Sequence, residues 1–174
     1  MAAPITTYQV IKDTTEHVVI KLTGSFDSTT QESNGVRIQA NTLYGALDSS
    51  RANLLSSTAN TGPLSYYGLT VHRVWYDCSS TGDVQLYWNA ATPATIFYFN
   101  GNGEYDGAGN WVTIPNNTKG TTGSKGDIGI VTRGMVANDS YTLVVELRKE
   151  NEYYQRGQLT DPGAFNYGEY NVTP

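Results

Sequence analysis

Apolar and polar residues alternate along much of this chain. The longest alternating run is Ser140–Lys149, in which Tyr141, Leu143, Val145 and Leu147 occupy every second position and the residues between them are mostly polar. Successive side chains of a β-strand point to opposite faces of the sheet. The run therefore predicts a strand with one face in the core and the other partly solvated.

The same two-residue period recurs elsewhere, and helical spacing is nearly absent. The pattern predicts strands at Thr7–Lys12, His17–Ser25, Val36–Ala40, Leu69–Asp77, Asp83–Trp88, Ala94–Phe99, Trp111–Pro115, Asp127–Thr132 and Ser140–Lys149. Turn-forming residues such as Gly, Ser, Asn and Asp separate several of them. Short strands joined by such turns predict an all-β fold, an antiparallel β-sandwich or jelly roll with extended N- and C-terminal arms.

One segment, Thr42–Ser57, departs from this pattern. Four of its residues are spaced as on one face of a helix: Leu43, Leu47, Arg51 and Leu54. Gly45 lies among them, and a glycine inside a helix costs about 1 kcal/mol relative to alanine. A short helix and a strand followed by a loop are both compatible with this segment.

The chain divides into a single β-sandwich domain at residues 1–150 and an aromatic C-terminal arm at residues 151–174. The arm carries five aromatic residues without any period: Tyr153, Tyr154, Phe165, Tyr167 and Tyr170. Aromatic residues are enriched in the cores of protein interfaces. We therefore expect these five residues to contact a neighbouring subunit, with packing against the chain's own sandwich as the alternative.

Composition and charge exclude several classes of function. The chain has 18 Gly and 13 Tyr, 16% charged residues and a net charge of −5 without a basic stripe, which argues against nucleic-acid binding. Its one cysteine, Cys78, excludes an intramolecular disulfide and a cysteine-based zinc site, and we expect it to be a small buried residue. Met1–Tyr8 lacks the features of a signal peptide, and no stretch reaches the roughly 20 apolar residues of a membrane span. We expect a chain that is synthesised in the cytoplasm and is not secreted, with no membrane partner.

Residues with catalytic or metal-binding chemistry do not form a recognisable motif. The two histidines, His17 and His72, lie in predicted strands, and no nucleophile motif accompanies them. Asn100–Asp106 is rich in glycine and is interpreted as a solvated hairpin loop. Its oxygen-bearing side chains at alternate positions make a calcium site the weaker alternative, and the carboxylate pair of Glu104 and Asp106 is a still weaker candidate for glycoside hydrolysis. Lys119–Gly126 lacks the ending of a phosphate-binding loop. We therefore predict no catalytic, cofactor-binding or metal-binding residues.

Carbohydrate binding is an alternative, because exposed aromatic rings stack against sugars. The candidate rings are Trp75, Tyr87, Trp88, Tyr98 and Trp111. The competing interpretation, which we favour, is that these rings fill the core.

Two parts of the sequence resemble a known group of proteins. They are Val71–Asp77 with Val84–Thr92, and Gly126–Thr132 with Asp139–Lys149. These strands and turns resemble small virion structural proteins of marine tailed bacteriophages, those of cyanophages especially. The resemblance covers about half of the chain. It implies a β-sandwich that assembles on the particle and has no catalytic residues.

The resemblance and the composition lead to one functional expectation. The chain is expected to be a non-enzymatic virion protein that decorates or cements the capsid. Its partners would be the major capsid protein or other virion structural proteins, and sister subunits in a homo-oligomer. A neck or tail component and a carbohydrate-binding host-adhesion module are the alternatives.

Overall fold

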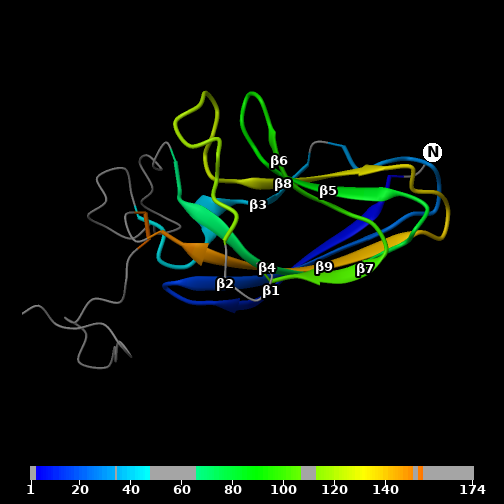
Figure 1. The fold of residues 1–174 in the computed structure, drawn as a ribbon, viewed down its shortest axis with the longest axis horizontal. Coiled ribbons are helices and arrows are strands. Elements are labelled where there is room, and N and C mark those ends of the chain that lie inside the picture. Colours follow the sequence, from blue (N-terminus) through cyan, green and yellow to red (C-terminus); the bar gives the residue numbers. More distant parts are fainter. Residues whose placement is uncertain (1–2, 34, 48–65, 107–112, 151–152, 155–174) are drawn as a thin grey trace, which may run out of the picture.

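The computed structural model describes residues 3–33, 35–47, 66–106, 113–150, 153 and 154. These residues form two antiparallel sheets that face each other, as the two layers of Figure 1 show. The predicted antiparallel β-sandwich is therefore confirmed. Its elements are β1 (Ile5–Asp13), β2 (His17–Ser25), β3 (Gly35–Ile38), η1, a 3₁₀ turn (Ala40–Thr42), β4 (Leu69–Cys78), β5 (Asp83–Trp88), β6 (Ala94–Phe99), β7 (Asn102–Tyr105), β8 (Ile128–Arg133) and β9 (Ser140–Lys149).

The two sheets differ in width. Sheet A has five strands in the order β1-β2-β9-β4-β7, and sheet B has four in the order β3-β8-β5-β6. β9 is the central strand of sheet A and pairs with β2 on one side and β4 on the other. The register places Leu143 of β9 between Leu22 of β2 and Tyr76 of β4. Strands distant in sequence thus form the middle of the sheet.

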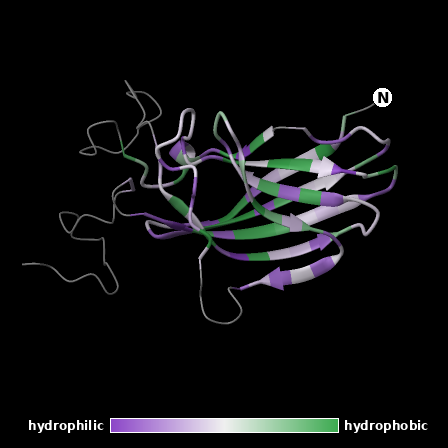
Figure 2. Ribbon diagram, turned by 45° about the horizontal axis from the view of Figure 1, so that its top comes forward, coloured by the Kyte–Doolittle hydropathy of each residue, from purple (hydrophilic) through white to green (hydrophobic). Residues whose placement is uncertain are grey.

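The core lies between the sheets and follows the period-2 pattern. Tyr141, Leu143, Val145 and Leu147 of β9 are buried, which confirms the predicted inward face. The alternation is visible in Figure 2 as green bands between purple or white ones along the strands. Each fully buried aliphatic side chain contributes about 1.5–3 kcal/mol through the removal of apolar surface from water.

Gly24 of β2 lets the ring of Tyr141 pack directly on the backbone of the neighbouring strand. A Cβ atom at this position would lie 2.3 Å from Cε1 of Tyr141, well inside van der Waals contact. The ring could then not keep its position. Glycine is therefore required at residue 24 by this close approach rather than by a turn.

The structure differs from the predicted elements in three places. Asn100–Asp106 was interpreted as a loop, but Asn102–Tyr105 is strand β7, which pairs with β4. In Trp111–Pro115 the described residues, 113–115, form no strand, and Ile114 only bridges to Val71. In Thr42–Ser57 the described residues, 42–47, contain no α-helix, and residues 48–57 lie outside the described chain.

A β-bulge changes the faces of β4. The register with β9 shifts between Val71 and Arg73, so that Val71 is buried whereas Arg73 and Trp75 are partly exposed. Simple alternation along the predicted strand Leu69–Asp77 would place these three residues on one face. The bulge inserts one residue, His72, and reverses the alternation after it.

The lateral side of the sandwich at β6 and β7 is closed by aromatic rings. Phe97 and Phe99 of β6 stack with their centroids 5.0 Å apart. Phe99 also contacts Tyr76 at 4.9 Å, and Phe97 contacts Tyr105 at 5.5 Å. Here the chain passes from sheet B to sheet A. The opposite lateral side, formed by β1 and β3, has no such cluster among the described residues.

The core continues past residue 150, where the predicted domain ended. Tyr153 and Tyr154 are both buried, and the Tyr154 hydroxyl donates a hydrogen bond of 2.8 Å to the carbonyl of Ala40. Tyr153 packs edge-on against Tyr66 with centroids 5.3 Å apart. The described part of residues 151–174 therefore belongs to the sandwich.

Candidate functional site

The outermost strand of sheet A, β1, exposes apolar side chains to solvent. Ile5 is 68% exposed, Tyr8 43%, Val10 42% and Ile11 55%. Because β2 is the one described strand that pairs with β1, every second residue of β1 directs its backbone N–H and C=O away from the described sheet. A strand edge of this kind is a template for pairing with another chain. We therefore take β1 as the candidate functional site.

The exposure of β1 follows from the unequal width of the sheets. Tyr8 pairs with Leu22 of β2, and Val10 pairs with Ile20. Both β2 side chains are fully buried, so Tyr8 and Val10 point toward the same face as the core. Sheet B, one strand narrower, leaves them open to solvent. The apolar interior is thus continuous with an open apolar margin.

A partly buried arginine holds the N-terminal half of β1 in place. The Nη2 group of Arg37, in β3, donates hydrogen bonds to the carbonyls of Thr7 (2.9 Å) and Thr23 (3.5 Å). Its Nη1 group donates to Oε1 of Glu32 (3.0 Å), and Oε2 of Glu32 accepts from the hydroxyl of Tyr141 (2.6 Å). Arg37 therefore links the edge of sheet B to β1 and β2.

Burial and the contacts with Tyr141 and Arg37 act in opposite directions on the pKa of Glu32. Burial raises the pKa of Glu32, and the hydrogen bonds from Tyr141 and Arg37 oppose this rise. Burial also raises the pKa of Tyr141 far above its usual value, so its hydroxyl keeps its proton and donates. The Tyr141 hydroxyl and the Arg37 guanidinium both donate to the Glu32 carboxylate, and hydrogen bonds to a charged group of this kind are stronger than neutral ones.

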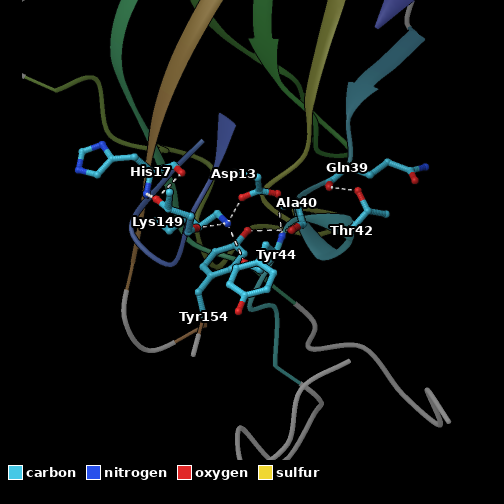
Figure 3. A network of polar contacts seen from close by, with 9 residues as sticks. Asp13, His17, Gln39, Ala40, Thr42, Tyr44, Lys149 and Tyr154 are labelled. Atoms are coloured by element: carbon cyan, nitrogen blue, oxygen red, sulfur yellow. Dashed lines mark hydrogen bonds and ion pairs between the residues drawn. The ribbon is translucent and has the colours of Figure 1, made fainter. Parts of the chain in front are cut away.

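A buried lysine holds the C-terminal end of β1 (Figure 3). Lys149, the last residue of β9, has no exposed side-chain surface, and its ammonium forms an ion pair with Asp13. The ammonium also donates to the carbonyls of Thr14 and Tyr44, each at 2.7 Å. Oδ2 of Asp13 in turn accepts from the backbone N–H of Tyr44 at 2.8 Å. All three ammonium donors are therefore used.

Aromatic rings complete the surroundings of this ammonium. The ring centroid of Tyr154 lies 5.1 Å from Nζ of Lys149, and that of Tyr44 lies 6.0 Å from it. Burial lowers the pKa of Lys149, and Asp13 opposes this effect. The cluster of Asp13, Tyr44, Lys149 and Tyr154 thus ties the end of β1 to the central strand, and it is called the lysine anchor below.

The predicted interface residues fall into two groups. Tyr153 and Tyr154 are buried in the chain's own core, which corresponds to the alternative considered for the arm. The other three, Phe165, Tyr167 and Tyr170, lie outside the described residues, so their contact with a neighbouring subunit stays a prediction.

The other three edge strands are shorter than β1. β3 and β7 have only four residues each. β3 contains the charged Arg37, and β7 contains Glu104, whose carboxylate lies 3.6 Å from Nε of Arg73. β6 has six residues and no charge, and its Tyr98 is 50% exposed. Among the described edge strands β1 is the longest, with nine residues, and its segment Ile5–Ile11 contains no Asp, Glu, Lys, Arg or His.

The histidines lie side by side on the outer side of sheet A. The rings of His17 and His72 meet edge to face with centroids 5.8 Å apart, and Nδ1 of His17 lies 3.5 Å from Oε1 of Glu146. Burial lowers the pKa of His17 more than Glu146 raises it. Among the described residues, no group of three or more His, Cys, Asp or Glu side chains is placed to hold a metal ion.

The remaining candidates from the sequence have structural surroundings. The amide of Asn100 donates to the carbonyl of Gly82 at 2.7 Å and so closes a turn beside β5. Cys78 is buried, which raises the pKa of its thiol to about 12 and suits the expected small buried residue. Gly120 and Gly123, with φ of +81° and +75°, shape the loop of Lys119–Gly126, which leads into β8 rather than a helix.

The five candidate sugar-stacking rings are dispersed. Tyr87 and Trp88 are buried, and Trp111 lies outside the described residues. Tyr98, on β6 of sheet B, is 50% exposed, and Trp75, on β4 of sheet A, is partly exposed. Because the two accessible rings belong to different sheets, they do not form one stacking platform.

Comparison of the chain with protein-family models, with curated proteins and with solved structures gave no match. The described residues contain no helix with the length and hydrophobicity that a membrane crossing requires.

The alternation of residues along β9 predicts that Lys149 of the lysine anchor points toward the core. Lys149 continues the series Tyr141, Leu143, Val145 and Leu147 and so belongs to the inward face of β9. A lysine at an inward position requires a carboxylate partner. The identity of that partner, Asp13, depends on the sheet order, which local sequence does not provide.

Proposed function

We propose that this chain is a non-catalytic structural protein of a tailed-bacteriophage particle that binds other proteins through β1, most specifically as a decoration or cement protein of the capsid. The observation that carries the binding role is the open edge of β1. It presents exposed apolar side chains and unpaired backbone groups from a strand anchored at both ends.

The anchoring matters because binding by strand addition favours a rigid edge. Extended segments that add to a sheet gain affinity from main-chain hydrogen bonds and specificity from alternate side chains. Arg37 and the lysine anchor fix β1 before any partner arrives, so less conformational entropy is lost on binding. This is the arrangement expected of a scaffold that assembles with its neighbours.

The assignment to a phage particle is supported by the likeness of the strand and turn patterns in Val71–Thr92 and Gly126–Lys149 to small virion proteins. A shell protein that tiles a surface needs a stiff domain with interacting edges, and a sandwich with one open edge provides both. A neck or tail component would need the same features and is the second candidate, separated from the first by copy number.

Quantitative mass spectrometry of purified particles whose genome encodes this chain tests the proposal. Shell decoration requires on the order of hundreds of copies per particle, whereas a neck or tail ring requires about a dozen. Absolute copy number, measured against the major capsid protein with isotope-labelled peptides, separates the two. If the chain is expressed during infection but missing from particles stripped of loosely bound protein, it is not a structural component.

A further inference from the structure

We propose that β1 pairs with β1 of a second copy of this chain, antiparallel about a two-fold axis at Tyr8, and so joins two copies of sheet A into one continuous sheet. The inference rests on the proposed role of β1 as a protein-binding edge. It does not depend on whether the chain belongs to a phage particle.

The residue pattern of β1 is symmetric about Tyr8. Reading outward, Thr7 and Gln9 are polar, Thr6 and Val10 are β-branched, and Ile5 and Ile11 are the same residue. A two-fold symmetric antiparallel pair matches each residue with its mirror position in the other copy. The pairs are then Tyr8 with Tyr8, Thr6 with Val10 and Ile5 with Ile11, and aromatic and β-branched pairs of this kind stabilise sheets.

The faces of these pairs agree. Thr6, Tyr8 and Val10 pair with Gly24, Leu22 and Ile20 of β2 and so point toward the core face of sheet A. In the joined sheet the same face of both copies carries Tyr8 and Val10. The uncovered Tyr8 and Val10 of one copy would then lie beside the same two residues of the other copy. The exposed fractions of Tyr8 and Val10 would fall.

Charge favours a second copy over a charged partner. Ile5–Ile11 contains no Asp, Glu, Lys, Arg or His, so no like charges face each other along the paired strands. The nearest charged residue along β1 itself is Lys12, which this register places opposite Pro4 of the other copy. The two Lys12 side chains are then eight residues apart along the strand direction, or about 27 Å. That separation exceeds the Debye length of about 8 Å at physiological ionic strength, so their repulsion is screened.

A β-bulge in β1 limits the length over which the two copies of β1 can pair, but it does not prevent the pairing. The register of β1 with β2 shifts between Val10 and Lys12, beyond the symmetric centre. Bulges end strand pairing by twisting the edge away. Direct pairing therefore extends over Thr6–Val10, with Ile5 and Ile11 in contact at its two ends.

Sedimentation velocity of the full chain tests the proposal, with Tyr8→Lys as the disrupting variant and Tyr98→Lys as its matched control. Tyr98 is a similarly exposed tyrosine on β6, the uncharged edge strand of sheet B. The wild-type chain, of 19.0 kDa, is expected to sediment as a dimer at about 100 µM and to dissociate into monomers on dilution. Tyr8→Lys puts two like charges directly opposite and should weaken dimerisation at least about tenfold, whereas Tyr98→Lys should leave it unchanged.

Circular dichroism melting of both variants checks that each remains folded, as the exposure of both tyrosines leads us to expect. A wild-type chain that is still monomeric at about 100 µM overturns the second-copy proposal. It does so even if the chain binds particles through β1. A dimer that persists in Tyr8→Lys, or that dissociates in Tyr98→Lys, shows that another surface joins the copies. Absence of the chain from particles would instead overturn the proposed function and leave the dimer intact.

Discussion

Replacement of Asp13 by alanine is expected to lower the free energy of unfolding by about 3–5 kcal/mol, because it leaves the fully buried ammonium of Lys149 without its carboxylate. The carbonyls of Thr14 and Tyr44 would still accept its hydrogen bonds, but they carry no compensating charge. Urea denaturation followed by tryptophan fluorescence measures the change.

The double variant Asp13→Ala, Lys149→Met separates the ion pair from other roles of Asp13. Methionine fills a similar volume without a charge, so the double variant should recover part of the stability lost in Asp13→Ala. The stability of Asp13→Ala should also rise with pH in the alkaline range. The folded state lowers the pKa of Lys149 and so binds fewer protons than the unfolded state. A loss below about 1 kcal/mol in Asp13→Ala would mean that the ammonium is hydrated rather than anchored.

Replacement of Leu143 by alanine is expected to cost about 2–5 kcal/mol, the range for truncating a buried aliphatic side chain. Leu143 is fully buried at the centre of sheet A, between Leu22 and Tyr76. The cavity left behind can collapse only partly, because both neighbouring strands are held by hydrogen bonds along their length. Thermal and urea unfolding give the change in free energy.

Thr142→Ala, one residue away on the same strand, is the matched control. Thr142 points to the outer face of sheet A, between Thr23 and Asp77, and is only partly buried. Its truncation should cost about 0.5 kcal/mol or less, as for most surface substitutions. Equal losses in the two variants would contradict the assignment of the inward face of β9.

Strands whose alternation is strong were predictable from the sequence alone. His17–Ser25 and Ser140–Lys149 have the predicted bounds, because burial alternates along both strands and fixes the period. Asp83–Trp88 and Ala94–Phe99 also have the predicted bounds, although burial does not alternate regularly along them. β7 escaped prediction, because Asn102–Tyr105 is short and contains glycine, and its strand conformation comes from pairing with β4. The bulge at His72 was not predicted for a related reason. The extra residue is recognised only from the register of β4 with its partner strand β9, which local sequence does not give.

The candidate site was less predictable than the fold. Thr7–Lys12 was predicted as a strand, but its edge position depends on the order of strands in sheet A, which is set by contacts between distant residues. The ion pair of Asp13 with Lys149 likewise joins the first strand to the last. The predicted site was instead placed in the aromatic arm, because composition identifies aromatic residues but not whether the chain's own core takes them.

Hydrogen–deuterium exchange of the amides in Ile5–Ile11 tests the central claim that β1 is the edge through which this chain binds other proteins. The amides that point away from β2 are expected to exchange rapidly in the dilute chain, since nothing in sheet A protects them. In the chain bound within purified particles, strand addition should slow their exchange, while the central strand β9 stays protected in both states. Equal exchange of Ile5–Ile11 in the free and bound chain, with new protection confined to another segment, would contradict the account.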